Sequence, residues 1–195
     1  MGKVKLVCLL GVGAGVLMQG VPAPLRAADA QRYAKVLTPL LDAAGGKSIG
    51  ALAPGAAVTV TGQSGSATHV ALPGWSAQGS TAVVATPERP VVLVSGYSGH
   101  ATPGAAKAAN GVTYHAVTVD GWVASGALTD DVQTVWKSAD ALFKEKCGSC
   151  HALPAVNALT VKQWPAILKT QAVNAGLDAG EAALLTAYLQ THTTR

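Results

Sequence analysis

The chain has 195 residues and a formal net charge of +4, with 12% charged and 49% hydrophobic residues. This length accommodates one or two domains. Without residues 1–30, the net charge would be about +2, which is too small to indicate a nucleic-acid-binding surface. The 5% aromatic content argues against a large aromatic core, and the 22 Gly and 10 Pro indicate many turns.

Residues 1–30 are typical of a secretory signal peptide. Lys3 and Lys5 precede an uncharged stretch over residues 6–25, and small residues follow at the usual cleavage positions, so we expect cleavage after Ala30. The apolar run is short for a membrane span, and an uncleaved anchor is the alternative. Export would place the protein in the periplasm, outside the bacterial inner membrane.

Residues 31–46 form a lead-in segment before a region rich in strand patterns. Their apolar residues recur at near-helical spacing, but Pro39 and the pair Gly45 and Gly46 limit any helix to a few turns. We therefore expect a short helix or an extended segment that packs on the domain after it.

Residues 47–128 contain a weak internal repeat, with copies at 47–86 and 88–128. Each copy has an alternating β-branched strand, a glycine-rich turn and a second strand that ends in Gly-Trp, at Trp75 and Trp122. The pattern resembles tandem bacterial SH3-like barrels, which implies a β domain of two small barrels. We expect both tryptophans to be core residues at the barrel ends; the alternative is that a ligand stacks on one of them.

Residues 129–195 contain three stretches with the period of amphipathic helices. The first stretch has an N-cap at Thr129 or Asp130 and continues into a cysteine motif. Capping-box patterns at 160–163 and 178–181 open the other two. A helix, a cysteine motif, a loop and two more helices predict a small all-α class I-like mono-haem cytochrome c domain.

The five residues from Cys147 to His151 read Cys-Gly-Ser-Cys-His, the attachment signature of c-type haem. Cys147 and Cys150 lie one helical turn apart, so both thiols can bond the vinyl groups of one porphyrin. The imidazole of His151 then comes under the same ring and can bind the iron as an axial ligand. We expect one covalent haem c, packed against the apolar stripe of the preceding helix.

Three other interpretations of this motif are weaker. A thioredoxin-like Cys-x-x-Cys should follow a strand, whereas this one follows a predicted helix. A zinc site would need two more ligands, and the sequence has no second Cys-x-x-Cys. A structural disulfide between Cys147 and Cys150 would leave His151 without a role.

The sixth ligand of the iron stays open at this point. A Met thioether usually fills this position, but the chain has only Met1 and Met18, both in the predicted signal peptide. One candidate is His192, at the end of the last predicted helix, and another is an open or water-filled position. Further candidate side chains are those of His115, His100, His69, Lys169 and Gln171. An imidazole would lower the reduction potential, whereas an open position would admit small ligands.

The order of these features resembles one family. The Gly-Trp repeats, a Trp-bearing helix and Cys-x-x-Cys-His are followed by Gln-Trp-Pro at 163–165 and Ala-Tyr-Leu-Gln at 187–190. This order is similar to the C-terminal mono-haem region of the c-type cytochrome subunits of trimethylamine N-oxide and dimethyl sulfoxide respiratory systems. The resemblance covers residues 47–195, without the N-terminal tetrahaem module of the family. The resemblance implies that a Met ligand of the family would lie near the position that Gln171 occupies in this chain.

The resemblance implies an electron-transfer subunit of anaerobic respiration, not itself an enzyme. The implied acceptor is a periplasmic molybdenum enzyme that reduces an N-oxide or S-oxide, and the implied donor is a quinol-oxidising multihaem cytochrome. Five lysines near the haem motif form either a solvated face or a ring that steers docking to an acidic partner. They are Lys137, Lys144, Lys146, Lys162 and Lys169.

Two other functions are compatible with the sequence. A haem-based sensor of small ligands would use an open sixth position, and binding of carbon monoxide to the reduced haem would distinguish it from an electron carrier. Alternatively, the β-rich region would bind the cell wall or another protein, with the haem as an accessory group.

Overall fold

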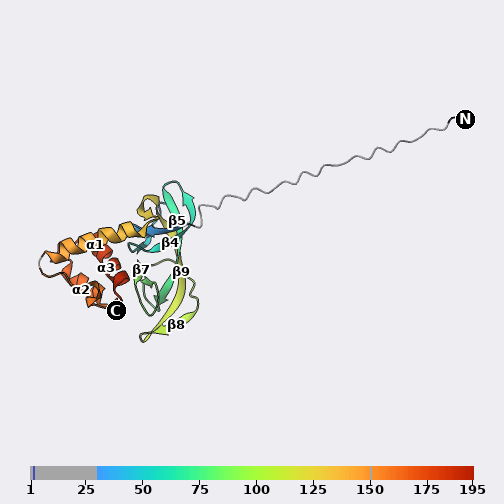
Figure 1. The fold of residues 1–195 in the computed structure, drawn as a ribbon. Helices are drawn as coiled ribbons and strands as arrows, with labels where there is room; N and C mark the ends of the chain where they lie inside the picture. The colour runs from blue at the N-terminus through green and yellow to red at the C-terminus, as the bar shows by residue number, and fades with distance from the viewer. Residues whose placement is uncertain (1, 3–29, 150) are drawn as a thin grey trace.

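The computed structural model describes residues 2, 30–149 and 151–195. Apart from Gly2 and Ala30, the predicted signal peptide lies outside the described residues, and so does Cys150 of the motif. In the described part, the strands come first and three α-helices follow (Figure 1). Within residues 30–149 and 151–195, no helix combines the length and the apolar character needed to cross a membrane.

Ten strands, of which β5 and β9 are the longest, make up the first part of the described chain. They are β1 (Gln31–Ala34), β2 (Thr38–Leu41), β3 (Ser48–Leu52), β4 (Ala57–Ser64), β5 (Ala67–Ala77), β6 (Val83–Val84), β7 (Val92–Ser95), β8 (Ala106–Ala109), β9 (Val112–Ala124) and β10 (Leu128–Thr129). Two 3₁₀ turns and three helices complete the part of the chain that the structure describes. They are η2 (Ser125–Ala127), α1 (Val132–Gly148), η3 (Val156–Ala158), α2 (Gln163–Gln171) and α3 (Ala179–His192).

Six strands close into a ring, in which each strand pairs with the next in the order β5, β6, β7, β3, β2 and β9, and β9 pairs back with β5. The other four strands extend this sheet: β4, β1 and β10 continue it beyond β5, and β8 continues it beyond β9. The ladder between β5 and β9 runs from Ala67 opposite Ala124 to Ala77 opposite Tyr114. The long pair of β5 and β9 is therefore part of the closed ring, and the other four strands extend the sheet from these two strands.

The predicted fold class, tandem SH3-like barrels followed by an all-α class I-like cytochrome c domain, is wrong. The two Gly-Trp strands of the repeat, β5 and β9, pair with each other and do not close separate barrels. The lead-in segment also joins the sheet, because β1 pairs with β4 and with β10. The molecule is instead a mostly β structure with three helices. Alternating residues predict strands, but they do not specify which strand pairs with which partner.

Trp75 and Trp122 are half-buried and lie outside the aliphatic core of the ring, contrary to expectation. Buried and less buried positions alternate along both strands, and Trp75 and Trp122 fall on the less buried side. Trp122 packs against His69, with 4.9 Å between the ring centroids and an angle of 58° between the ring planes. The core itself is built from aliphatic residues that include Leu40, Leu52, Leu72, Val94 and Val119.

Helix α1 begins at the N-cap Asp131, whose side chain accepts a hydrogen bond from the backbone N–H of Gln133. The N-cap was predicted at Thr129 or Asp130. It is instead the next residue, Asp131, because Thr129 still belongs to β10. The helix then runs to Gly148, which confirms that it continues into the cysteine motif.

The two predicted capping boxes form their hydrogen bonds. Before α3, the Asp178 side chain accepts from the backbone N–H of Glu181, and the Glu181 side chain accepts from that of Asp178. Before α2, the same exchange joins Thr160 and Gln163, at 2.9 and 3.3 Å. These bonds satisfy N–H groups that have no partner within the helix.

The helices are held against the sheet at two places. The Trp136 indole of α1 packs on Gly55, in the turn between β3 and β4. The Arg89 guanidinium, on the loop before β7, donates to backbone carbonyls at the C-terminal end of α3, where carbonyls lack partners and a cation is favoured. These carbonyls belong to Gln190, Thr191 and Thr193. The C-terminal end of α1 and helix α2 project away from the sheet (Figure 1).

Candidate functional site

The cysteine motif borders a cleft of about 460 Å³ between the C-terminal half of α1, the segment after α1 and helix α2. Helix α1 contributes Phe143 and Cys147, and the segment after α1 contributes His151 and Pro154. The cleft therefore brings together Cys147 and His151, two of the three residues predicted to hold a haem. The third, Cys150, lies outside the described residues.

The opposite wall of the cleft is one face of α2. Trp164, Ile167, Leu168 and Gln171 all line it, and their spacing of three and four residues places them on the same side of a helix. Trp164 and Leu168 are buried, whereas Ile167 is 43% exposed. This stripe was not predicted, although its three- and four-residue period is visible in the sequence.

Two buried aromatic rings line the cleft and pack against each other. Phe143 and Trp164 are each 2% exposed, and their rings meet edge to face with 6.2 Å between centroids. The indole N–H of Trp164 donates to the carbonyl of Val156 at 2.9 Å, so the ring is held in one orientation. These contacts make a preformed apolar surface next to Cys147.

Cys147 is a free, half-buried cysteine in the last turn of α1. Burial raises the pKa of its thiol above the ordinary value. The position at a helix C-terminus, the negative end of the helix dipole, also disfavours a thiolate. Redox-active cysteines are found in the opposite setting, with a lowered pKa at a helix N-terminus. The surroundings of Cys147 therefore give no support to a thioredoxin-like site.

The ring of His151 has a defined tautomer. Its Nδ1 lies 2.8 Å from the carbonyl oxygen of Ala152. A carbonyl oxygen can only accept, so Nδ1 carries the proton and donates it. The Nε2 atom of the neutral ring is then left with a free lone pair. A backbone carbonyl on one ring nitrogen is the usual companion of metal ligation by the other.

Of the six side chains considered as a sixth ligand, Gln171 lines the cleft, whereas the other five do not. His192 lies toward the start of α1: its Nδ1 is 2.8 Å from the Tyr188 carbonyl, and its ring packs on Trp136 at 5.2 Å. His69 lies on β5, where its Nδ1 is 2.6 Å from Thr61 Oγ1. The structure thus separates His192 from Cys147 and His151 and places Gln171 with them.

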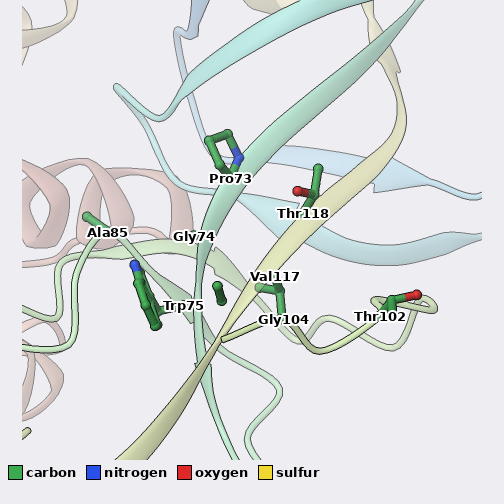
Figure 2. Close-up of a pocket in the computed structure, with 9 residues that line it drawn as sticks. Pro73, Gly74, Trp75, Ala85, Thr102, Gly104, Val117 and Thr118 are labelled. Atoms are coloured by element: carbon green, nitrogen blue, oxygen red, sulfur yellow. The ribbon is translucent and has the colours of Figure 1, made fainter. Parts of the chain in front are cut away.

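A second pocket, of about 420 Å³, lies over the paired strands β5 and β9, beside Ala85, Thr102 and Gly104. Figure 2 shows Pro73, Gly74 and Trp75 along β5 and Val117 and Thr118 on β9, the antiparallel strand with which β5 pairs. No residue that lines this pocket has an acidic, basic or thiol side chain. In residues 30–149 and 151–195, no three His, Cys, Asp or Glu side chains gather as a metal site.

Comparison with known proteins gives matches over part of the chain. The chain is 32% identical over 137 residues to the cytochrome c-type protein TorY of Escherichia coli O157:H7, an alignment that covers 56% of this chain and 37% of TorY. It is 29% identical over 69 residues to the cytochrome c-type protein TorC of the same organism, covering 35% of this chain and 18% of TorC. Part of this chain is similar to c-type cytochromes.

The similarity to TorY and TorC supports the predicted resemblance at the level of c-type cytochromes. The chain spans well under half the length of these curated relatives. No protein-family model matches the chain, and no solved structure matches it. The more specific resemblance, to one mono-haem region of a respiratory cytochrome subunit, stays a prediction.

The residues of the cleft fit a haem. The volume of about 460 Å³ falls within the range of about 300 to 1,000 Å³ that is usual for sites of small molecules and cofactors. The walls are mainly apolar, and Cys147 and His151 line the same space. Ile167, which lines the cleft, is 43% exposed, and Leu153, in the segment after α1, is 39% exposed. Both leave aliphatic surface uncovered. A flat apolar group held by the motif would cover such surface.

Proposed function

We propose that this protein is a periplasmic electron carrier, in which residues 129–195 hold one haem c through Cys147 and Cys150, with His151 as an axial ligand. The observation that carries this proposal is that Cys147 and His151 line the same apolar cleft. The partial similarity to TorY and TorC supports it. When bound, the haem supplies one-electron redox chemistry.

The chain itself supplies attachment, orientation and exclusion of water. Cys147 would hold the group at the end of α1, and the bond from His151 to the Ala152 carbonyl orients the imidazole that would face it. Phe143 and Trp164 give one side of the cleft a dry, rigid surface. Such an apolar shell controls solvent access and through it the reduction potential.

The electron acceptor that we propose is a periplasmic molybdenum enzyme that reduces an N-oxide or S-oxide, and the donor is a quinol-oxidising multihaem cytochrome. The family resemblance supports both partners. Lys162 and Lys169 stand before and within α2, the helix that lines the cleft, and both are exposed. Neither has an ion pair among the described residues, so both are free to meet an acidic partner.

The test is electron transfer between purified proteins. The haem-loaded protein is reduced, separated from reductant and mixed with a purified molybdenum-containing trimethylamine N-oxide reductase. We expect re-oxidation that requires both the enzyme and the N-oxide and that slows at high salt. The same experiment is then repeated with dimethyl sulfoxide and a purified dimethyl sulfoxide reductase. A protein that stays reduced in both arms, while a dye donor shows that the enzymes are active, would overturn the proposed acceptor.

A further inference from the structure

The less buried face of the sheet carries a histidine between a hydroxyl and a carboxylate. Thr61 lies on β4, His69 on β5 and Asp120 on β9, and β5 pairs with both of its neighbours. In the ladder between β5 and β9, His69 stands opposite Trp122, and Asp120 stands opposite Ala71. His69 and Asp120 are therefore diagonal neighbours on one face, at a separation that long side chains can bridge.

The hydrogen bonds of Thr61 assign the tautomer of His69. The Thr61 hydroxyl donates to the backbone carbonyl of His69 at 3.3 Å, and its oxygen lies 2.6 Å from the ring Nδ1. A hydroxyl has only one proton to donate. With that proton on the carbonyl, Nδ1 carries its own proton and donates it to Thr61 Oγ1. The Nε2 atom of the neutral ring is then left with a free lone pair.

This lone pair belongs to an atom close to a carboxylate. The Nε2 atom of His69 lies 3.7 Å from Asp120 Oδ2, which is too long for a hydrogen bond. Within residues 30–149 and 151–195, no other basic group lies within ion-pair distance of Asp120. The charge of Asp120 is also felt by Tyr97, whose pKa is raised by burial and, to a smaller extent, by this carboxylate. A cation between the two acceptors would satisfy both of them.

We propose that His69 and Asp120 bind a divalent transition-metal ion, best Cu²⁺, with water completing its coordination. Donors that each lie about 2.0–2.2 Å from one ion are roughly 3 to 4 Å apart, and 3.7 Å falls within that range. Nitrogen and oxygen ligands suit Cu²⁺, which binds most tightly among the divalent first-row ions. The side chains of His69 and Asp120 are 29% and 60% exposed, so water can reach the ion. This inference does not depend on the proposed haem.

Thr61 and Trp122 would act as positioning residues of this site. A bulge in β4 between Val60 and Gly62 places Thr61 beside His69. A bond from the second ring nitrogen to an oxygen is the usual way in which a ligating histidine is oriented. The Trp122 ring packs against the imidazole at 4.9 Å, so an indole lies next to the ligating group and can report on it.

The experiment titrates CuCl₂ into the oxidised, exported full-length protein and follows it by calorimetry, tryptophan fluorescence and EPR. We expect one site that quenches Trp122 and shows a nitrogen ligand in the EPR spectrum of Cu²⁺. His69→Gln should abolish this site, and Asp120→Asn should weaken it, because a neutral amide replaces a charged ligand. Thr61→Val should weaken binding by about 10–100-fold, the usual cost of losing an outer partner.

Two controls separate this site from other ligands for copper. Trp122→Phe should keep the heat of binding and lose most of the quenching. His100→Gln removes an exposed loop histidine with no carboxylate within ion-pair distance in residues 30–149 and 151–195, and should change neither signal.

Three results would overturn this inference. They are a wild-type protein that binds no Cu²⁺, binding that is unchanged in His69→Gln, and binding that is lost in His100→Gln. The first result would indicate that a proton alone joins His69 to Asp120. A protein that carries no haem by mass would overturn the proposed function but leave this site on the sheet untouched, so the two failures are distinguishable.

Discussion

The indole of Trp136 packs so closely on Gly55 that a Cβ atom at position 55 would stand 2.0 Å from the ring. This contact joins α1 to the turn between β3 and β4, whose backbone at Gly55 has a φ of +76°. The glycine is required for two separate reasons: the left-handed backbone and the space that the indole occupies. The position of α1, which carries Cys147 at its far end, therefore depends on this turn.

Gly55→Ala should destabilise the protein for both reasons. The left-handed backbone should cost about 1–2 kcal/mol, and the clash with the indole should add about 1–3 kcal/mol. Gly79→Ala is the matched control, because Gly79 has a φ of +75° and no atom within 4 Å of the added Cβ. Urea unfolding of both variants measures the difference. Equal losses of stability would show that the indole yields without cost.

Arg89→Ala should weaken the junction between the sheet and α3. One Nη2 group of the guanidinium, which has two N–H bonds, faces three carbonyls at the C-terminal end of α3, and each charged bond of this kind is worth about 1.5–3 kcal/mol before losses through exposure. Since Arg89 is exposed, we expect a total loss of about 1–3 kcal/mol. The control is Lys107→Ala, which removes an exposed, solvent-screened ion pair with Glu88 and should cost less than the loss of Arg89. Similar losses in both variants would contradict the role of Arg89.

The helices were predictable because their signals are local. Asp178 and Glu181, or Thr160 and Gln163, are three residues apart, and their exchange of hydrogen bonds follows from that spacing alone. The sheet was not predictable in the same way. The pairing of β5 with β9 joins two copies of a repeat, and the alternation within each strand is equally compatible with two separate barrels.

The same distinction applies to the site. Cys147 and His151 were predicted because the motif is contiguous, and both line the same cleft, while their role as haem-binding residues stays a prediction. The choice between Gln171 and His192 depends on how α2 and α3 pack on α1, which no contiguous motif describes. The helical period of the stripe from Trp164 to Gln171 could have been predicted from the sequence. That this stripe faces Cys147 could not have been predicted in the same way.

The reactivity of the Cys147 thiol should depend on pH in a particular way. Burial raises the pKa of Cys147, so in a haem-free Cys150→Ser variant the thiol should stay protonated at neutral pH. Alkylation should be slow near pH 7 and accelerate only above the ordinary thiol pKa. Because the folded-state pKa is the raised one, the associated stability is present below the unfolded pKa and lost as the pH rises through the folded one.

Alkylation rates measured between pH 6 and pH 10, on the folded and the urea-unfolded variant, provide the comparison. The unfolded chain supplies the ordinary thiol as its own control. A folded thiol that reacts faster than the unfolded one at pH 7 would indicate an activated, redox-type cysteine and would contradict the account of its surroundings.

Lys162→Glu combined with Lys169→Glu should slow electron transfer to the molybdenum enzyme. Both lysines are exposed beside the cleft helix, and reversal of charge there should weaken association with an acidic partner, most of all at low salt. The control is Lys47→Glu, an exposed lysine between β2 and β3. Stopped-flow rates over a range of salt concentrations provide the measurement. A slowing by Lys47→Glu equal to that of the α2 variant would place docking elsewhere.

The most direct measurement is the intact mass of the protein exported by a bacterial host that matures c-type cytochromes. The account predicts a chain that begins after Ala30 and is heavier than its polypeptide by one haem, with the added mass on the peptide that contains Cys147 and Cys150. A Cys147→Ala, Cys150→Ala double variant should lose that mass. The bare polypeptide mass in the exported wild-type protein would contradict the proposed cofactor, and with it the proposed electron transfer.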